Sequence, residues 1–205
     1  MEEMEDPRHR HPAFIQTCHD EVLTEKRILD NLFISESFYV KSNHRSVSNF
    51  LTEQRRLLIE WMLEICQVNQ NSNQVFLSAV CYLDNILSPR LVRTSQLQSL
   101  AAACLCLSSK LQDPRPLSLR VFLGLPEASL SGLQEMELTV LARVRWDLAA
   151  PTSLDFLPLL WSSISRGIIL PANVTNTKVL ENAETFLVLA ATEAKYCHRY
   201  PSLMV

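Results

Sequence analysis

Glycine is scarce in this chain, which contains only three among 205 residues. Neither GxGxxG nor GxxxxGK followed by Ser or Thr occurs. The chain therefore lacks the glycine-rich loop that cradles phosphates in kinases, P-loop proteins and dinucleotide-binding folds. The common catalytic motifs are missing as well, and the five histidines show no obvious nucleophile–base spacing. We therefore expect a protein that is not an enzyme itself and uses no cofactor.

Other absences narrow the class further. The chain contains no apolar run of 18 or more residues, so no membrane helix is predicted. The N-terminus has no apolar core of the kind found in signal peptides. The net charge of −3 gives no basic excess for nucleic acid. None of the six cysteines forms a CxxC pair, so no metal site is expected. These features predict reduced thiols in a protein of the nucleus and cytoplasm.

The chain is instead rich in hydrophobic residues, at 47%, and their three- and four-residue spacing predicts helices. A flexible tail is predicted over residues 1–19, and a polar connector is predicted from 35 to about 48. Helices are predicted at 20–34, 49–69, 74–88, 95–111, 117–124, 130–146, 152–165 and 178–196, with a further start at 201. Five of them lie within residues 49–146, and the middle one is the most apolar, as expected of a helix surrounded by the others.

Several motifs occur in an order that resembles one known family. Residues 54–65 (QRRLLIEWMLEI) resemble the signature of the cyclin box, and residues 82–88 (YLDNILS) resemble its Tyr-Leu-Asp-Arg-Phe-Leu-Ser motif. Further matches follow in sequence at 97–98, 108–110, 136–138 and 146–152. The amino-acid sequences of these segments are most similar to those of D-type cyclins.

The resemblance implies an all-α fold: an N-terminal helix and a five-helix cyclin box within residues 20–150, then an incomplete second cyclin-like fold in 151–205. It also implies a regulatory subunit that binds and activates a cyclin-dependent kinase and promotes progression from the first gap phase into DNA synthesis. Two alternatives stay open. One is a non-activating or decoy module that occupies the kinase unproductively. The other is a transcription-factor-like cyclin fold, which would need a basic face.

Two charged residues match the positions at which the family contacts the mobile helix of the kinase. Lys110 ends one predicted apolar helix and Glu137 lies within another, and opposite charges beside an apolar patch would fix the register of a partner helix. Taken alone, the two residues could equally be solvated surface charges. The apolar positions that match the same interface are Leu107, Leu111, Leu141, Trp146 and Leu148. Together these seven residues are called the contact surface below.

A second surface is implied by the first helix of the box. Its residues match the shallow patch that binds Arg-x-Leu motifs of substrates and inhibitors, and they are called the docking surface below: Gln54, Leu57, Trp61, Glu64 and Leu97. The family usually has methionine at the position of Gln54, so weaker docking is expected. Trp61 could also be an ordinary core tryptophan. Finally, Arg55 and Asp84 match a buried ion pair of the family whose role is to fix helix geometry.

Overall fold

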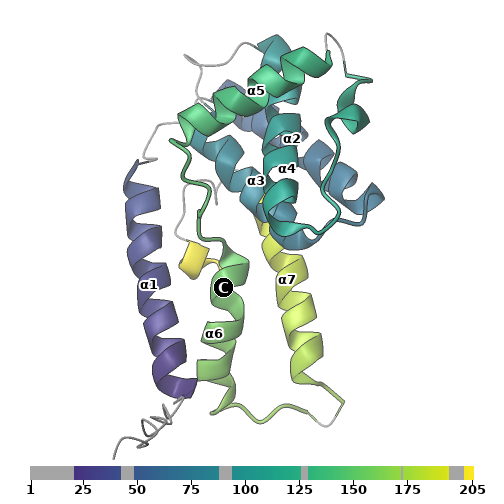
Figure 1. Ribbon diagram of the computed structural model, residues 1–205. Helices are drawn as coiled ribbons and strands as arrows, with labels where there is room; N and C mark the ends of the chain where they lie inside the picture. The colour runs from purple at the N-terminus through teal and green to yellow at the C-terminus, as the bar shows by residue number, and fades with distance from the viewer. Residues whose placement is uncertain (1–20, 43–48, 88–93, 126–128, 172, 194–200) are drawn as a thin grey trace, which may run out of the picture.

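The computed structural model describes residues 21–42, 49–87, 94–125, 129–171, 173–193 and 201–205. Within these ranges the regular structure consists of helices, with no strand. The α-helices are α1 (Glu21–Ser42), α2 (Asn49–Val68), α3 (Asn73–Ile86), α4 (Leu97–Gln112), α5 (Leu130–Arg143), α6 (Ser153–Ser165) and α7 (Asn176–Thr192). The short 3-10 helices are η1 (Thr94–Gln96), η2 (Leu119–Phe122) and η4 (Pro201–Leu203). The predicted all-α fold is confirmed (Figure 1).

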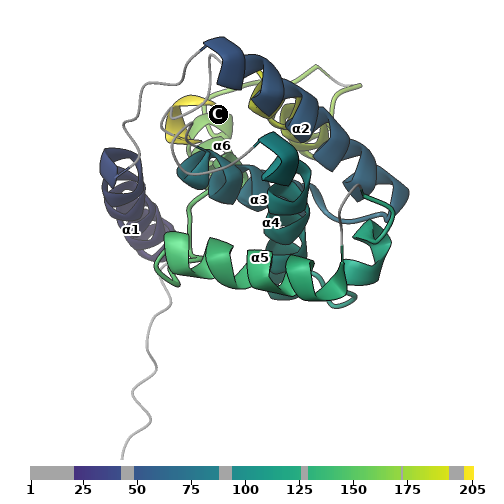
Figure 2. The ribbon, with the colours of Figure 1, turned by 90° about the horizontal axis from the view of Figure 1, so that it is seen from above.

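The core of the molecule surrounds α4. This helix packs against α2, α3, α5 and η2, and in the view from above it lies inside the ring of the other helices (Figure 2). Its residues 100–109 are all buried. Ala101, Ala102 and Ala103 carry small side chains that let neighbouring backbones approach closely, while Leu100 and Leu105 fill the core. The prediction that the middle helix is enclosed by its neighbours is therefore confirmed.

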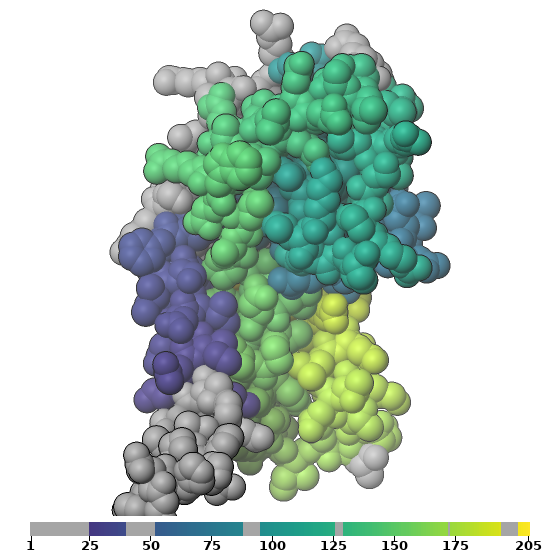
Figure 3. All heavy atoms as spheres, viewed as in Figure 1, coloured from purple at the N-terminus to yellow at the C-terminus, as the bar shows by residue number. Residues whose placement is uncertain are grey.

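Helices α6 and α7, called the second half below, join this bundle through α7. Helix α7 contacts α3 and α2, and α6 lies against α1 and α7. In the space-filling view, α1, α6 and α7 together form the part of the molecule opposite α4 and α5 (Figure 3). The domain boundaries predicted at residues 20 and 150 stay predictions, and the predicted tail at 1–19 lies outside the described residues.

The first helix is longer than predicted. Helix α1 continues to Ser42, through a segment whose polar composition indicated a connector. Tertiary contacts explain the difference: Tyr39 donates a hydrogen bond to the Cys81 carbonyl at 3.2 Å and accepts one from Asn85 at 3.1 Å. Earlier in the helix, Phe33 packs on Phe156 of α6 with ring centroids 5.4 Å apart. Such long-range contacts override local helix propensity.

The helix ends also depart from the prediction in detail. Helix α3 begins at Asn73, one residue before the predicted start, because the Ser72 hydroxyl accepts the Val75 N–H at 3.4 Å. Helix α4 begins at Leu97, two residues after the predicted start, and follows Gln96, which makes no side-chain cap. Of the described helices, none has the length and apolar character needed to cross a membrane.

Candidate functional site

Lys110 and Glu137 come together on the surface of the bundle. Lys110 stands in the last turn of α4 and Glu137 lies in the middle of α5, and the packing of these two helices places Nζ of Lys110 2.6 Å from Oε1 of Glu137. The lysine side chain is 46% exposed and the glutamate side chain only 11%. The carboxylate is therefore held in a partly desolvated position, where a charge-assisted hydrogen bond is stronger than in water.

Cys106 lies one helical turn before Lys110 and is buried. Burial, and less strongly the negative charge of Glu137, raises the pKa of its thiol to about 12, and the positive charge of Lys110 opposes the shift. A thiol with such a pKa stays protonated at neutral pH and is a poor nucleophile. Cys106 is thus a buried packing residue.

The apolar members of the contact surface divide into two groups. Leu111 is 55% exposed and Trp146 is 70% exposed, so both present apolar area to solvent. Leu107 is buried, and Leu141 and Leu148 are half-buried and pack against the core. The contact surface therefore combines three leucines that pack against the core with two exposed apolar side chains.

Trp146 owes its exposed position to an unusual backbone. Helix α5 ends in a Schellman motif, in which the Trp146 N–H binds the Leu141 carbonyl at 2.9 Å and the Arg145 N–H binds the Ala142 carbonyl at 3.2 Å. Arg145 and Trp146 have φ angles of 57° and 61°, in the left-handed region that glycine normally occupies. The predicted helix to residue 146 therefore ends at Arg143, and the turn directs the chain to Leu148, whose carbonyl accepts a hydrogen bond from Tyr82 at 2.8 Å.

Leu138 was missed by the sequence reasoning. It follows Glu137 on α5, is 60% exposed, and lies one turn before Leu141. Residues three apart share a helix face, so Leu138 extends the contact surface. The i, i+3 spacing to Leu141 could have indicated this, but an exposed leucine and a core leucine look the same in a sequence.

The docking surface lies on α2 and the start of α4, which pack together. Trp61 is half-buried and stacks on Phe122 with centroids 5.9 Å apart, so it is both a core residue and a surface residue. Leu97 is buried beneath the surface, whereas Leu57 is 49% exposed. Gln54 is half-buried and Glu64 is exposed. By their spacing Gln54, Leu57, Trp61 and Glu64 share one face of α2, with the two apolar side chains between an amide and a carboxylate.

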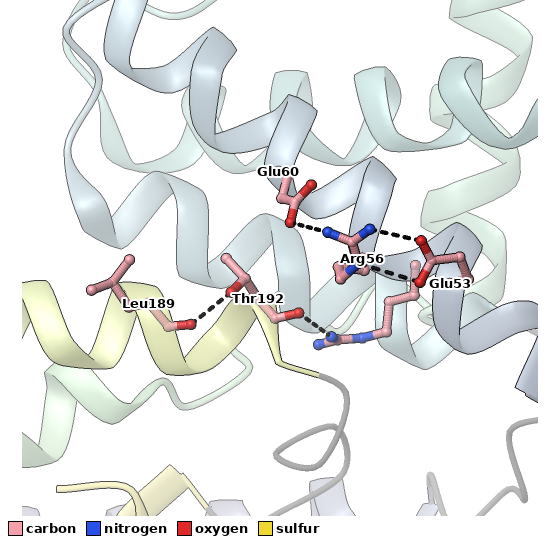
Figure 4. A network of polar contacts seen from close by, with 6 residues as sticks. Glu53, Arg56, Glu60, Leu189 and Thr192 are labelled. Atoms are coloured by element: carbon pink, nitrogen blue, oxygen red, sulfur yellow. Dashed lines mark hydrogen bonds and ion pairs between the residues drawn. The ribbon is translucent and has the colours of Figure 1, made fainter.

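Arg56, next to this surface, was not singled out in the sequence. Its guanidinium binds Glu53 on one side, at 2.7 and 3.3 Å, and Glu60 on the other, at 2.6 Å. Figure 4 shows the arginine between the two carboxylates on α2. Arg56 holds the pKa of Glu53 below its usual value, chiefly through the hydrogen bond between the two side chains.

The predicted Arg55–Asp84 pair is present and does more than the sequence indicated. Arg55 binds Asp84 through two bonds, of 2.6 and 2.9 Å, and its side chain is 2% exposed. The same guanidinium donates to the carbonyls of Ala191 at 3.1 Å and Thr192 at 3.4 Å, at the end of α7. Helix C-terminal carbonyls carry partial negative charge. The ion pair therefore joins α2, α3 and α7.

Within the part of the chain that the structure describes, no group of three or more His, Cys, Asp or Glu side chains is gathered in a way that could hold a metal ion.

The sequence is similar to proteins of one known family over most of its length. Residues 16–149 match the family model described as "Cyclin, N-terminal domain". The chain is similar to G1/S-specific cyclin-D3 of Bos taurus, with 35% identity over 188 residues, which cover 89% of this chain and 63% of the relative. It is also similar to G1/S-specific cyclin-D2 of Xenopus laevis, with 31% identity over 191 residues and the same two coverages.

The fold has a counterpart among solved structures. The crystal structure of a viral cyclin from herpesvirus saimiri superposes with a TM-score of 0.70, covering 86% of this chain and 77% of the viral chain at 24% identity. At that identity the likeness concerns the fold alone. The chain spans 63% of the length of the curated D3 relative from Bos taurus.

Proposed function

Because this chain belongs to the cyclin family, we propose that it is a regulatory subunit that binds and activates a cyclin-dependent protein kinase of the class that pairs with D-type cyclins. In this role it promotes passage from the first gap phase into DNA synthesis, and it acts in the nucleus and cytoplasm. The catalytic chemistry belongs to the kinase. The similarity to G1/S-specific cyclins supports the cell-cycle role.

The observation that carries the proposal is the Lys110–Glu137 pair with its apolar surroundings. A lysine and a glutamate joined at 2.6 Å still offer unused donors and acceptors to a partner backbone. Leu111 and Leu138 stand exposed on the two helices that carry the pair, and Trp146 is exposed in the turn that follows α5. Interfaces of this type draw their affinity from buried aromatic and aliphatic anchors and their register from charges.

The proposed mechanism is a population shift. A kinase whose catalytic helix moves between inactive and active positions is driven toward the active one by a partner that binds that position more tightly. In the active position the helix supplies the glutamate that pairs with the ATP-binding lysine. The cyclin needs only a rigid surface for this role, and the enclosed helix α4 makes the bundle rigid.

The test is a double variant, Lys110→Ala with Glu137→Ala. It should no longer co-purify with the kinase while it retains its helical circular dichroism spectrum. The matched control is Lys178→Ala with Glu181→Ala, which removes one exposed charge of each sign from α7. Normal kinase binding by the folded double variant at residues 110 and 137 would rule the proposal out.

A decoy that binds the kinase without activating it is a second candidate. The observation that favours it is the exposed apolar surface of α7, where Phe186 and Leu189 face solvent. A phosphorylation assay on the reconstituted complex separates the two functions. Stable binding with no gain in phosphate transfer supports the decoy, and a large gain in phosphate transfer is expected of an activator.

We also propose that the docking surface recruits substrates or inhibitors that carry an Arg-x-Leu motif. An exposed leucine, Leu57, beside the half-buried Trp61 suits the apolar residue of the motif, and the carboxylate of Glu64 suits its arginine. Binding at this surface is independent of the kinase, so the two proposals can fail separately.

A further inference from the structure

The margin of the docking surface contains a charge of the wrong sign for an arginine-bearing peptide. We propose that Arg56 is a built-in competitor for the arginine of a docked Arg-x-Leu peptide, and that it lowers the affinity of this surface for basic motifs by occupying the carboxylates they need. The inference rests on the docking surface proposed above and concerns how that surface selects its ligand.

The geometry of α2 places the competing groups side by side. Side chains three, four or seven positions apart lie on one face of a helix. Glu53, Leu57, Glu60 and Glu64 follow this spacing and line one edge of the docking surface. The arginine of a peptide whose leucine contacts Leu57 would therefore approach a helix face that carries a row of three carboxylates.

Two of these three carboxylates are already engaged. Arg56 binds Glu53 with Nη2 and Nε, and it binds Glu60 with Nη1. Glu64, by contrast, has no hydrogen bond or ion pair with any residue that the structure describes, and it is exposed. An incoming guanidinium thus finds one available carboxylate, and it gains a second only by displacing Arg56 from Glu60.

Displacing Arg56 from Glu60 costs a small amount of binding free energy. Arg56 is 44% exposed, and surface ion pairs of this kind contribute modestly because solvent screens them. The positive charge of Arg56 also repels the approaching guanidinium, and the range of this repulsion shortens as ionic strength rises. Both effects act on the basic residue of the peptide. The apolar contacts with Leu57 and Trp61 are not affected by either, so the competition concerns charge alone.

The experiment compares Arg56→Ala with the unsubstituted protein, using two labelled synthetic peptides that differ only in having Arg-x-Leu or Ala-x-Leu. Fluorescence anisotropy should show about three- to tenfold tighter binding of the Arg-x-Leu peptide to Arg56→Ala at low salt. The gain should shrink at higher ionic strength. Binding of the Ala-x-Leu peptide should not change. Arg56→Lys, which keeps the charge, should resemble the unsubstituted protein.

Arg166→Ala is the matched control, because it changes the net charge by the same amount at the exposed end of α6. Equal tightening by Arg166→Ala and Arg56→Ala would mean that net charge alone is responsible, and would overturn the inference. Unchanged affinity in Arg56→Ala overturns it too, provided that Leu57→Ala abolishes peptide binding and so confirms the docking surface. If neither the unsubstituted protein nor Arg56→Ala binds either peptide, the docking surface and the inference fall together.

Discussion

The bundle of α2–α5 and the second half formed by α6 and α7 are stabilised differently. In α4 an unbroken run of ten residues, 100–109, is buried, and the bundle holds most of the core. In α7 the buried residues are Leu187, Val188 and Ala191, while Phe186 is 69% exposed. The bundle therefore encloses its own hydrophobic surface, whereas the second half obtains its order largely by packing against the bundle and α1.

The polar contacts between the two regions are few and specific. Arg55 of α2 donates to the last carbonyls of α7, and Asn73 of α3 donates to Glu184 of α7 at 3.0 Å. At the start of α6, Gln74 of α3 donates to Asp155 at 3.1 Å, and the Thr152 hydroxyl lies 2.8 Å from the same carboxylate. We infer that a change in the bundle affects the whole molecule, while a change at any of these contacts affects mainly the second half. Three predictions test this contrast.

The largest expected effect is the loss of stability of the bundle at alkaline pH. The described cysteines all lie in the bundle: Cys66, Cys81, Cys104 and Cys106. Burial raises the pKa of all four thiols, to about 12 at Cys66, Cys81 and Cys106. As pH rises above the ordinary thiol value, the unfolded chain loses these protons before the folded chain does. The stability contributed by the buried neutral thiols is thus complete below about pH 9 and is lost as pH rises toward 12.

Each such thiol should lower the free energy of unfolding by up to about 1.4 kcal/mol per pH unit above 9. Urea unfolding under reducing conditions at pH 8, 9 and 10 measures the slope. Mass spectrometry after iodoacetamide treatment at pH 8 provides the check in the folded state, where the four thiols should stay unmodified. A flat stability profile from pH 8 to 10 would contradict the burial of these thiols.

The next effect is expected at the contact between the two regions. Arg55→Ala removes the partner of Asp84 and the donors to Ala191 and Thr192. Leaving one member of a buried ion pair uncompensated costs about 3–5 kcal/mol. Amide hydrogen exchange should show the greatest loss of protection in α7 and a smaller one in α4. Arg56→Ala, which alters the neighbouring but exposed arginine, is the control and should leave exchange in α7 unchanged.

The fold was largely predictable from sequence where the local pattern is strong. The three- and four-residue spacing of apolar residues located α2, α3, α4 and α6 to within one or two positions. The length of α1 was not predictable, because the segment after residue 34 is polar and its helical state depends on contacts of Tyr39 with α3. The composition of a segment does not show which distant residues will contact it in the folded protein.

The site shows the same limit. The family pattern indicated Lys110 and Glu137, and the structure places them in contact, but their role in kinase binding stays a prediction. Leu138 could not be distinguished from a core leucine, and nothing in the sequence showed that Arg55 would bind carbonyls more than 130 positions away. Arg56 was indistinguishable from a solvated charge, although Glu53 and Glu60 at i−3 and i+4 were visible partners.

The smallest effect is expected at the start of α6. The Thr152 N–H donates to Asp155 Oδ2 at 2.7 Å, and the buried Thr152 hydroxyl lies 2.8 Å from the same oxygen and 3.2 Å from Oε1 of Gln74. Thr152→Val keeps the volume of the side chain and removes the hydroxyl, so it leaves Asp155 and Gln74 with one donor fewer. The free energy of unfolding should fall by about 1 kcal/mol.

Thr152→Ser is the matched variant, because it retains the hydroxyl and loses only a methyl group. Its thermal unfolding temperature should be close to that of the unsubstituted protein. In Thr152→Val, protection against hydrogen exchange should fall in α6 but not in α4. Equal destabilisation by valine and serine would show that packing of the methyl group, rather than the bonds to Asp155 and Gln74, holds the start of α6. In that case the polar coupling of the second half to the bundle would come from the contacts of Arg55 and Asn73 with α7, and the contrast between the regions would rest on α7 alone.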